Sequence, residues 1–133
     1  MELSDYLDGT KGIGVLATAD SKGKVNAALY ARPHFTDRYT AVFLMDDRLT
    51  HKNLSSNPNA VYLFVESGRS FKGKRIYLTK KHEEEEPEFI DGLRLRHCGT
   101  CEEANYTAKY VAYFHIDKVL PLVGSGTQSN EST

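Results

Sequence analysis

A short segment between Asp47 and Pro58 gathers cationic and hydroxyl side chains at the expected start of a helix. The segment reads DRLTHKNLSSNP, with Asp47 as the expected N-cap and the proline ending the helix. The side chains near its first turn are Arg48, Thr50, His51 and Lys52. Cations are unfavourable there, because the unpaired N–H groups of a helix start already carry partial positive charge. A phosphate group would offset that charge, so the segment predicts a phosphate site.

The two aspartates at the start of this segment allow a second interpretation. Asp46 and Asp47 can neutralise the neighbouring cations, and the segment would then be an ordinary surface helix without a ligand. The local sequence favours neither interpretation over the other.

The stretch VNAALYAR alternates two kinds of side chain, as a strand with two different faces does. Asn26, Tyr30 and Arg32 share one face and can point together toward a ligand or a partner subunit. Ala27 and Ala28 are small enough for a flat ring to approach the backbone. The alternative is a strand at the rim of a barrel, with polar side chains that simply face water.

Strand-forming segments outnumber helical ones along the chain. Six stretches are rich in β-branched and aromatic residues or alternate with period two, which is typical of strands. They are Ile13–Ala19, Val25–Arg32, Tyr39–Met45, Ala60–Glu66, Arg75–Lys80 and Tyr110–Ile116. A second helix is expected from Pro87 to His97, because acidic residues precede it and basic residues end it. We therefore expect a mainly β protein, a small β-barrel with two short helices.

The cysteines and the remaining histidines predict no metal site. Cys98 and Cys101 follow the end of the second expected helix, whereas a redox CxxC motif normally opens a helix. A structural zinc site would need two further ligands beyond this pair. We expect two thiols in a surface loop, with a redox pair and a metal site as the alternatives. His34 and His115 belong to no recognisable ligand pair.

Length, charge and hydropathy restrict the possible partners. A chain of 133 residues suits one domain, expected at 1–124, and the polar tail 125–133 is expected to be disordered. The net charge of −1 gives no overall field that would attract nucleic acid or an anionic membrane. No apolar run approaches the ~18 residues of a membrane span, and no secretory leader opens the sequence. We expect a cytoplasmic protein.

Taken in order, these motifs resemble the pyridoxamine 5′-phosphate oxidase-related FMN-binding split-barrel family. The matching blocks are GVLATAD-SKGK-VNAALY, YTAVFLMDDRLTHKNLSSNPNAVYLF, GKRIYLT and YFHIDKVLPLVG, within Leu7–Gly124. The resemblance implies a six-stranded antiparallel split barrel that binds flavin mononucleotide (FMN) at the interface of a homodimer.

The family pattern also implies which residues hold the flavin. In the family, the helix start after the third strand grips the phosphate, and the ring system rests on the second strand and the end of the third. The corresponding residues are Asn26, Ala27, Ala28, Tyr30, Leu44, Met45, Asp46, Arg48, Leu49, Thr50, His51, Lys52 and Asn53. The family often has Ser and Lys where this chain has Arg48 and Thr50, so the cationic charge moves by two positions.

The sequence contains no catalytic motif of protein side chains such as G-x-S-x-G, H-E-x-x-H or a P-loop. Any chemistry would then be that of the cofactor. The resemblance predicts an FMN-dependent oxidoreductase or electron carrier with a small-molecule donor or acceptor. Pyridoxamine phosphate oxidation itself is not expected, because the basic C-terminal segments that it needs are not found in this sequence. The alternatives are a haem-binding or haem-degrading split barrel and a cofactor-free interaction module.

Overall fold

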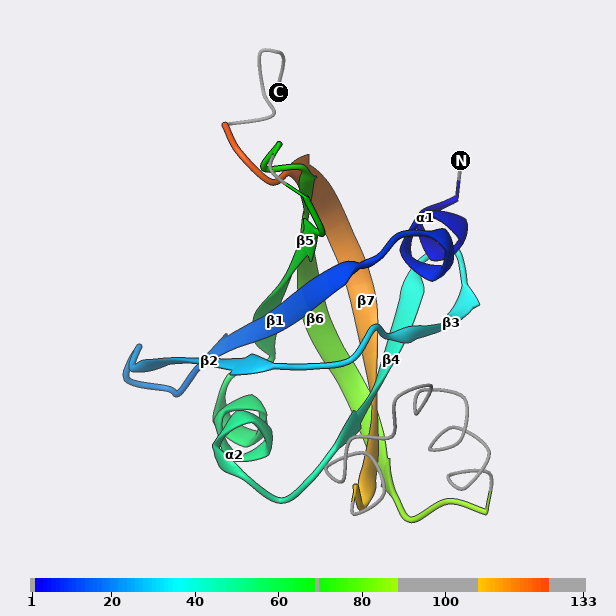
Figure 1. Cartoon of the computed structure of the whole chain (residues 1–133). Coiled ribbons are helices and arrows are strands. Elements are labelled where there is room, and N and C mark those ends of the chain that lie inside the picture. The colour runs from blue at the N-terminus through cyan, green and yellow to red at the C-terminus, as the bar shows by residue number, and fades with distance from the viewer. Residues whose placement is uncertain (1, 69, 89–107, 125–133) are drawn as a thin grey trace.

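The computed structural model describes residues 2–68, 70–88 and 108–124. Within them, seven strands form one antiparallel sheet, and two helices lie near opposite ends of β1 (Figure 1). The helices are α1 (Leu3–Gly9) and α2 (Leu49–Ser56), and the strands are β1 (Gly12–Ala19), β2 (Val25–Leu29), β3 (His34–Asp37), β4 (Thr40–Met45), β5 (Asn59–Glu66), β6 (Gly73–Glu85) and β7 (Tyr110–Pro121).

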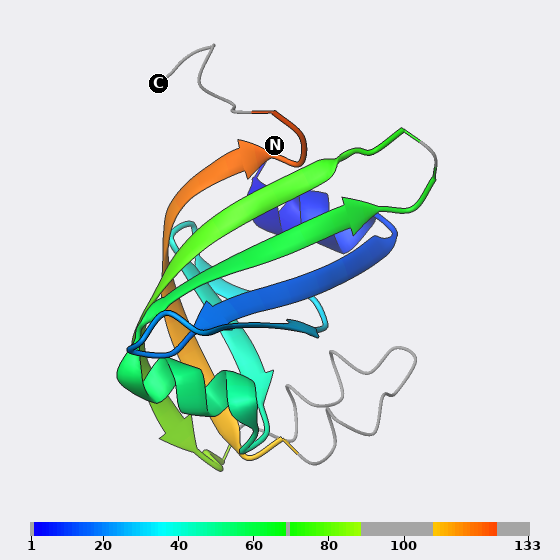
Figure 2. The same cartoon turned by 90° about the vertical axis from the view of Figure 1, so that its left-hand side faces the viewer.

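The sheet curves strongly but does not close (Figure 2). Its strand order is β2-β1-β5-β6-β7-β4-β3, so β2 and β3 are the two end strands. The expected mainly β fold is confirmed, whereas the count of six strands was one too low. The missed strand, β3, has only four residues and pairs with β4 alone, which is too short for a period-two pattern to show.

The ends of several elements also differ from the expectation. β2 stops at Leu29, and β6 continues through Glu85, so the glutamates Glu83–Glu85 belong to a strand. They were expected to lead into a helix, but pairing with β7 extends along the whole of β6 and overrides local propensity. Helix α1 was not expected. The second expected helix lies largely outside the described residues, and so do Cys98 and Cys101.

The core lies inside the curve of the sheet. Its largest fully buried side chains include Tyr62, Phe43, Phe64 and Phe114, together with Leu7 from α1. Among the described residues, no helix has the length and the apolar character needed to cross a membrane.

Two glycines of β1 let aromatic rings of β5 lie directly beneath it. A Cβ at Gly14 would lie 1.8 Å from the Tyr62 hydroxyl, and a Cβ at Gly12 would lie 2.7 Å from the Phe64 ring. Because both positions lack a side chain, the Tyr62 hydroxyl reaches past β1 and donates a hydrogen bond to the Tyr30 carbonyl at 3.1 Å. This bond fixes the chain where it leaves β2.

Candidate functional site

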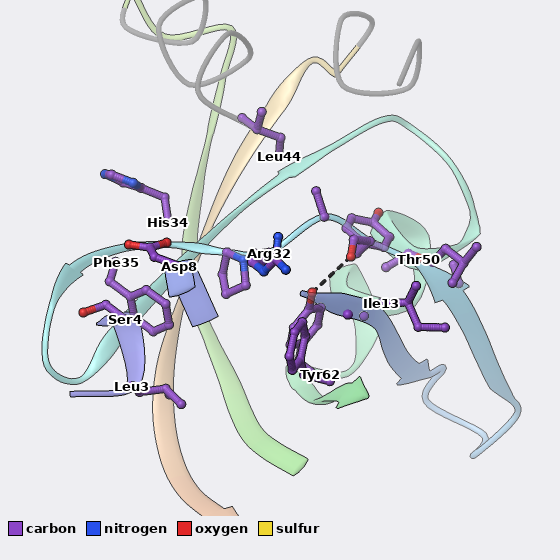
Figure 3. A pocket seen from close by; sticks show the side chains of 18 of the residues that line it. Leu3, Ser4, Asp8, Ile13, Arg32, His34, Phe35, Leu44, Thr50 and Tyr62 are labelled. Carbon is purple, nitrogen blue, oxygen red and sulfur yellow. Dashed lines mark hydrogen bonds between the residues drawn. The ribbon is translucent and has the colours of Figure 1, made fainter. Parts of the chain in front are cut away.

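A hollow of about 1350 Å³ lies on the open side of the sheet, along the chain that runs from β2 to β3. One end of it, which we call the α2 half, is lined from β2, the end of β4 and the start of α2. The other end, the α1 half, is lined from α1 and β3. Figure 3 shows Thr50 and Tyr62 on one side, Ser4 and Phe35 on the other, and Arg32 between them.

Helix α2 begins without a capping side chain. Arg48, and not Asp47 as expected, is the N-cap residue, and it makes no side-chain capping hydrogen bond. The first turn contains no acidic residue. Asp47 is instead turned toward His51, with 3.5 Å between its Oδ1 and the imidazole Nδ1. The first amide groups of α2 therefore lack a side-chain acceptor from their own N-cap.

The aspartates do not close this end of the hollow. The Nε of Arg48 lies 3.8 Å from Oδ2 of Asp46, and the Arg48 side chain is 77% exposed. The Asp46 side chain is only 15% exposed, but an ion pair this long, with one partner in solvent, contributes little to stability. Arg48 and Thr50 both line the hollow, and the exposed Arg48 guanidinium is within reach of an anion in the α2 half, while Thr50 is buried beside it.

The inner face of β2 supplies polar groups beside α2. Asn26 donates from Nδ2 to Oγ1 of Thr50 at 3.3 Å, which ties β2 to the helix start. Burial raises the pKa of the Tyr30 phenol above its ordinary value, while Thr50 and Arg48 favour the ionised form less strongly. Tyr30 therefore stays protonated at neutral pH and can act as a hydrogen-bond donor in the hollow.

The expected alternation of β2 is confirmed. Asn26, Ala28 and Tyr30 are half-buried on the inner face, while the outer face carries the exposed side chains of Val25 and Leu29. The inner face is thus the more polar one.

His51 faces away from the hollow. Its Nε2 lies 3.0 and 2.9 Å from the two carboxylate oxygens of Glu83 on β6, and its ring stacks on Tyr110 of β7 at 3.9 Å. Nearby, Asn53 donates from Nδ2 to Oγ1 of Thr18 at 3.1 Å. These two side chains hold α2 against the sheet.

The structure thus separates the predicted cofactor-binding residues into two groups. Those that line the hollow are Asn26, Ala28, Tyr30, Leu44, Asp46, Arg48, Leu49 and Thr50. Those that do not line it are Ala27 on the outer face of β2, Met45 in the core, the packed side chains of His51 and Asn53, and the exposed Lys52. Their role in binding a flavin remains a prediction.

Several lining residues were not among the predicted ones. Gly14, Tyr62 and Phe64 enter the hollow because β1 and β5 pair in a register that places Gly14 opposite Phe64. The sequence carries no local signal for that register. Arg32 was expected to share a face with Asn26 and Tyr30, and it also lines the hollow.

Solved structures share this arrangement of elements. An FMN-binding protein from Syntrophomonas wolfei subsp. wolfei superposes with a TM-score of 0.76 at 22% identity, covering 93% of this chain and 86% of that chain. HupZ from Group A Streptococcus gives 0.69 at 21% identity, with 91% of each chain covered. HutZ, the haem storage protein from Vibrio cholerae, gives 0.63 at 14% identity, with 90% of this chain and 91% of that chain covered.

The protein has the split-barrel fold. This confirms, at the level of the fold, the resemblance to the FMN-binding split-barrel family. No protein-family model matches the sequence, and no curated protein matches it either. At these identities the likeness shows the fold alone, and the ligand of this split barrel depends on the residues of its own hollow.

Proposed function

We propose that this split barrel binds FMN in the α2 half of the hollow, with the phosphate at the start of α2. The observation that carries the proposal is the uncapped start of α2, where the exposed Arg48 guanidinium and the Thr50 hydroxyl both line the hollow. A phosphate there would accept from free amides and a guanidinium together, and such charge-assisted bonds are the strong ones.

The neighbouring surface suits a flat ring system. Ala28 is the small inward-facing residue of β2, and Tyr30 and Leu44 line the hollow beside it. β2 is an end strand of the sheet, so one of its backbone edges has no strand partner within the described residues. Free backbone donors and acceptors are what the polar edge of a flavin needs.

The proposed activity is that of an oxidoreductase or electron carrier with a small-molecule donor or acceptor. Bound FMN supplies hydride or single-electron transfer, and the protein binds and orients it. Arg48 and Thr50 would hold the phosphate. Asn26 positions Thr50, and Tyr30 can donate a hydrogen bond from its protonated phenol.

The direct test is the absorbance spectrum of the purified protein, followed by FMN titration of the apoprotein with flavin fluorescence as the readout. We expect quenching in the wild type and an affinity roughly tenfold to a hundredfold weaker in Arg48→Met, since charge-assisted bonds to the phosphate are lost. Arg38→Met is the matched control, because Arg38 lines the α1 half. A colourless protein that does not quench FMN would refute the proposal, and so would equal affinity in Arg48→Met.

We also propose a homodimer, which is supported by an exposed apolar surface on the outer face of β1 and β2. The residues Val25, Leu29 and Ile13 are 83%, 74% and 61% exposed. Val15 faces Leu29 across the two strands, and Ala17 faces Ala27. An apolar surface that continues over two strands is typical of a protein interface. Leu29 and Ile13 also line the hollow, so a second subunit here would deepen the flavin site.

Light scattering and analytical ultracentrifugation test the dimer. We expect Leu29→Glu to give a monomer that also binds FMN more weakly, because the charge would be buried in the interface. Lys22→Glu, in the β1–β2 turn, is the control for adding a negative charge on the same hairpin. A wild-type monomer at micromolar concentration would contradict the dimer.

A haem-binding function is the second candidate. It is favoured by the likeness to HutZ, a haem storage protein, and by His34, the one imidazole that lines the hollow among the described residues. Hemin titration tests it, with a shift of the Soret band that is lost in His34→Ala and kept in His115→Ala. A protein that binds neither hemin nor FMN would instead be an interaction module.

A further inference from the structure

We propose that the α1 half of the hollow binds the carboxylate of a second small molecule through the guanidinium of Arg32. The inference rests on the proposed function, in which FMN occupies the α2 half and exchanges electrons with a second ligand. It concerns a different group of residues, so the two proposals can fail separately.

Arg32 is held rigidly at the boundary between the two halves. It lies on the chain between β2 and β3, and Figure 3 shows it between the lining side chains of each half. Its Nη2 donates to the Thr10 carbonyl, and its guanidinium carbon lies 5.3 Å from the centre of the Phe64 ring. A guanidinium fixed in this way loses little conformational freedom when it binds an anion.

The guanidinium has unused hydrogen-bonding capacity. Its Nε is buried and has no hydrogen-bond partner among the residues that the structure describes. A buried N–H without an acceptor costs free energy, so the protein alone does not satisfy the hydrogen-bonding groups of this guanidinium. Arginine presents its N–H groups as a planar fork that matches the two oxygens of a carboxylate.

The pattern of ion pairs among the lining residues distinguishes Arg32 from the other arginines. Arg38 donates to Glu2 at 3.0 Å, and Arg48 lies 3.8 Å from Asp46. Within the described part of the chain, Arg32 is the arginine of the hollow that has no carboxylate partner. Asp8 and Asp37 also line the hollow, but neither forms an ion pair with Arg32, so no carboxylate among the described residues neutralises this guanidinium by direct contact.

The surrounding residues restrict the ligand to a small molecule with one negative charge. Leu3, Pro33 and Phe35 line the α1 half and offer apolar contact to the body of a ligand. Asp8 and Asp37 line the same half and would repel a second anionic group. The hollow of about 1350 Å³ exceeds the roughly 300–1,000 Å³ of a pocket for one small ligand, so a second ligand fits beside the cofactor.

The test uses benzoate as the probe, with benzamide as its neutral isostere and phenyl phosphate as the dianion. Proton–nitrogen correlation spectra of the ¹⁵N-labelled, FMN-loaded protein show arginine Nε–H signals, and the signal of Arg32 is the one missing in Arg32→Lys. We expect benzoate to shift that signal, benzamide to bind about tenfold more weakly, and phenyl phosphate to bind no more tightly than benzoate.

Two variants locate the site. Arg32→Met should weaken benzoate binding about tenfold or more, whereas Arg75→Met should leave it unchanged, because Arg75 does not line the hollow. Equal benzoate affinity in wild type and Arg32→Met would overturn the proposal. An Arg32 Nε–H signal that benzoate does not move would also overturn it, and this readout remains available if Arg32→Met does not fold.

FMN affinity separates this proposal from the previous one. We expect Arg32→Met to keep the FMN affinity that Arg48→Met loses. If Arg32→Met weakens FMN binding as much as Arg48→Met does, Arg32 belongs to the cofactor site and the present inference is wrong. If the wild type does not bind FMN at all, the flavin proposal fails, and the benzoate titration of the free protein still decides whether Arg32 binds a carboxylate.

Discussion

The two halves of the hollow each lie beside the start of a helix, and the two helix starts differ in charge. Glu2 is the N-cap residue of α1, and Asp5 lies in its first turn. Carboxylates therefore match the partial positive charge of the first amides of α1. Arg48 is the N-cap residue of α2, and the first turn of α2 has no acidic residue. Neither start has a capping side-chain hydrogen bond. The comparison shows that α1 has a carboxylate to match the partial charge of its first amides, whereas α2 has none of its own, which is why we propose an anion there.

The largest expected effect comes from a change at Gly14, where β1 and Tyr62 both line the hollow. Gly14→Ala would place a Cβ 1.8 Å from the Tyr62 hydroxyl, so either β1 or Tyr62 must move. We expect a loss of about 3 kcal/mol in the free energy of unfolding, together with weaker binding in both halves. Urea denaturation measures the loss. Gly9→Ala is the control, because nothing lies within 4 Å of a Cβ there, and an equal loss in both variants would contradict the explanation.

Reversing the charge at the start of α2 should separate stability from binding. Arg48→Asp supplies a good N-cap residue, so we expect α2 to gain about 0.5–1 kcal/mol of stability. The same change removes the cation and repels phosphate, so FMN affinity should fall about a hundredfold. Thermal denaturation and FMN titration measure the two effects. If stability and FMN affinity both fell, the start of α2 would not be an uncapped helix end that binds the phosphate.

The packing of His51 offers a smaller test of how the α2 half is positioned. His51→Ala removes the hydrogen bonds to Glu83 and the stacking on Tyr110, which should cost about 2 kcal/mol and loosen the start of α2. FMN affinity should fall although His51 does not line the hollow. His51→Phe retains a ring on Tyr110 without the hydrogen bonds. An unchanged FMN affinity in both variants would show that the phosphate site does not depend on this contact.

Acid should weaken the same attachment of α2. Burial opposes the charge of Glu83, but hydrogen bonds from Lys80 and His51 outweigh it and hold the Glu83 pKa below its usual 4.5. A lowered pKa in the folded state stabilises the protein above pH 4.5, and this stabilisation is lost as the pH falls through the folded-state pKa. Denaturation at several pH values should show that wild type loses more stability below about pH 4.5 than Glu83→Gln does. Parallel curves would exclude Glu83 as the cause.

The smallest expected effect lies at α1. Asp5→Asn removes the carboxylate from the first turn of α1 and should cost about 0.5 kcal/mol of stability. FMN affinity should not change, because Asp5 does not line the hollow. Urea denaturation measures the change in stability, and FMN titration measures the affinity. A clear change in FMN affinity would mean that the two halves are coupled and do not bind independently.

Much of the fold and part of the candidate site could be predicted from local pattern. The period-two alternation of β2 correctly placed Asn26 and Tyr30 on its more buried face, and both line the hollow together with Arg32. The segment DRLTHKNLSS formed the expected helix next to it. Helix α1 was missed although Leu3, Tyr6 and Leu7 have helical spacing, because the segment is short and lacks a capping residue.

Local pattern could not show which way the cationic residues of α2 point. His51 is spaced from Arg48 as a residue of the same helix face would be, yet its imidazole meets Glu83 on β6, far away in the sequence. That contact requires β6 to continue past Lys80, and only its pairing with β7 extends it.

By itself, the sequence determined which segments became the strands around the hollow and which residues share a face of β2, because alternation and propensity act over a few neighbouring residues. Only the tertiary structure decided that β2 and β3 end the sheet, that Gly14 admits Tyr62, and that Arg32 separates two halves of one hollow. These features depend on strand register and on contacts between distant segments, and register is set by packing the whole sheet at once.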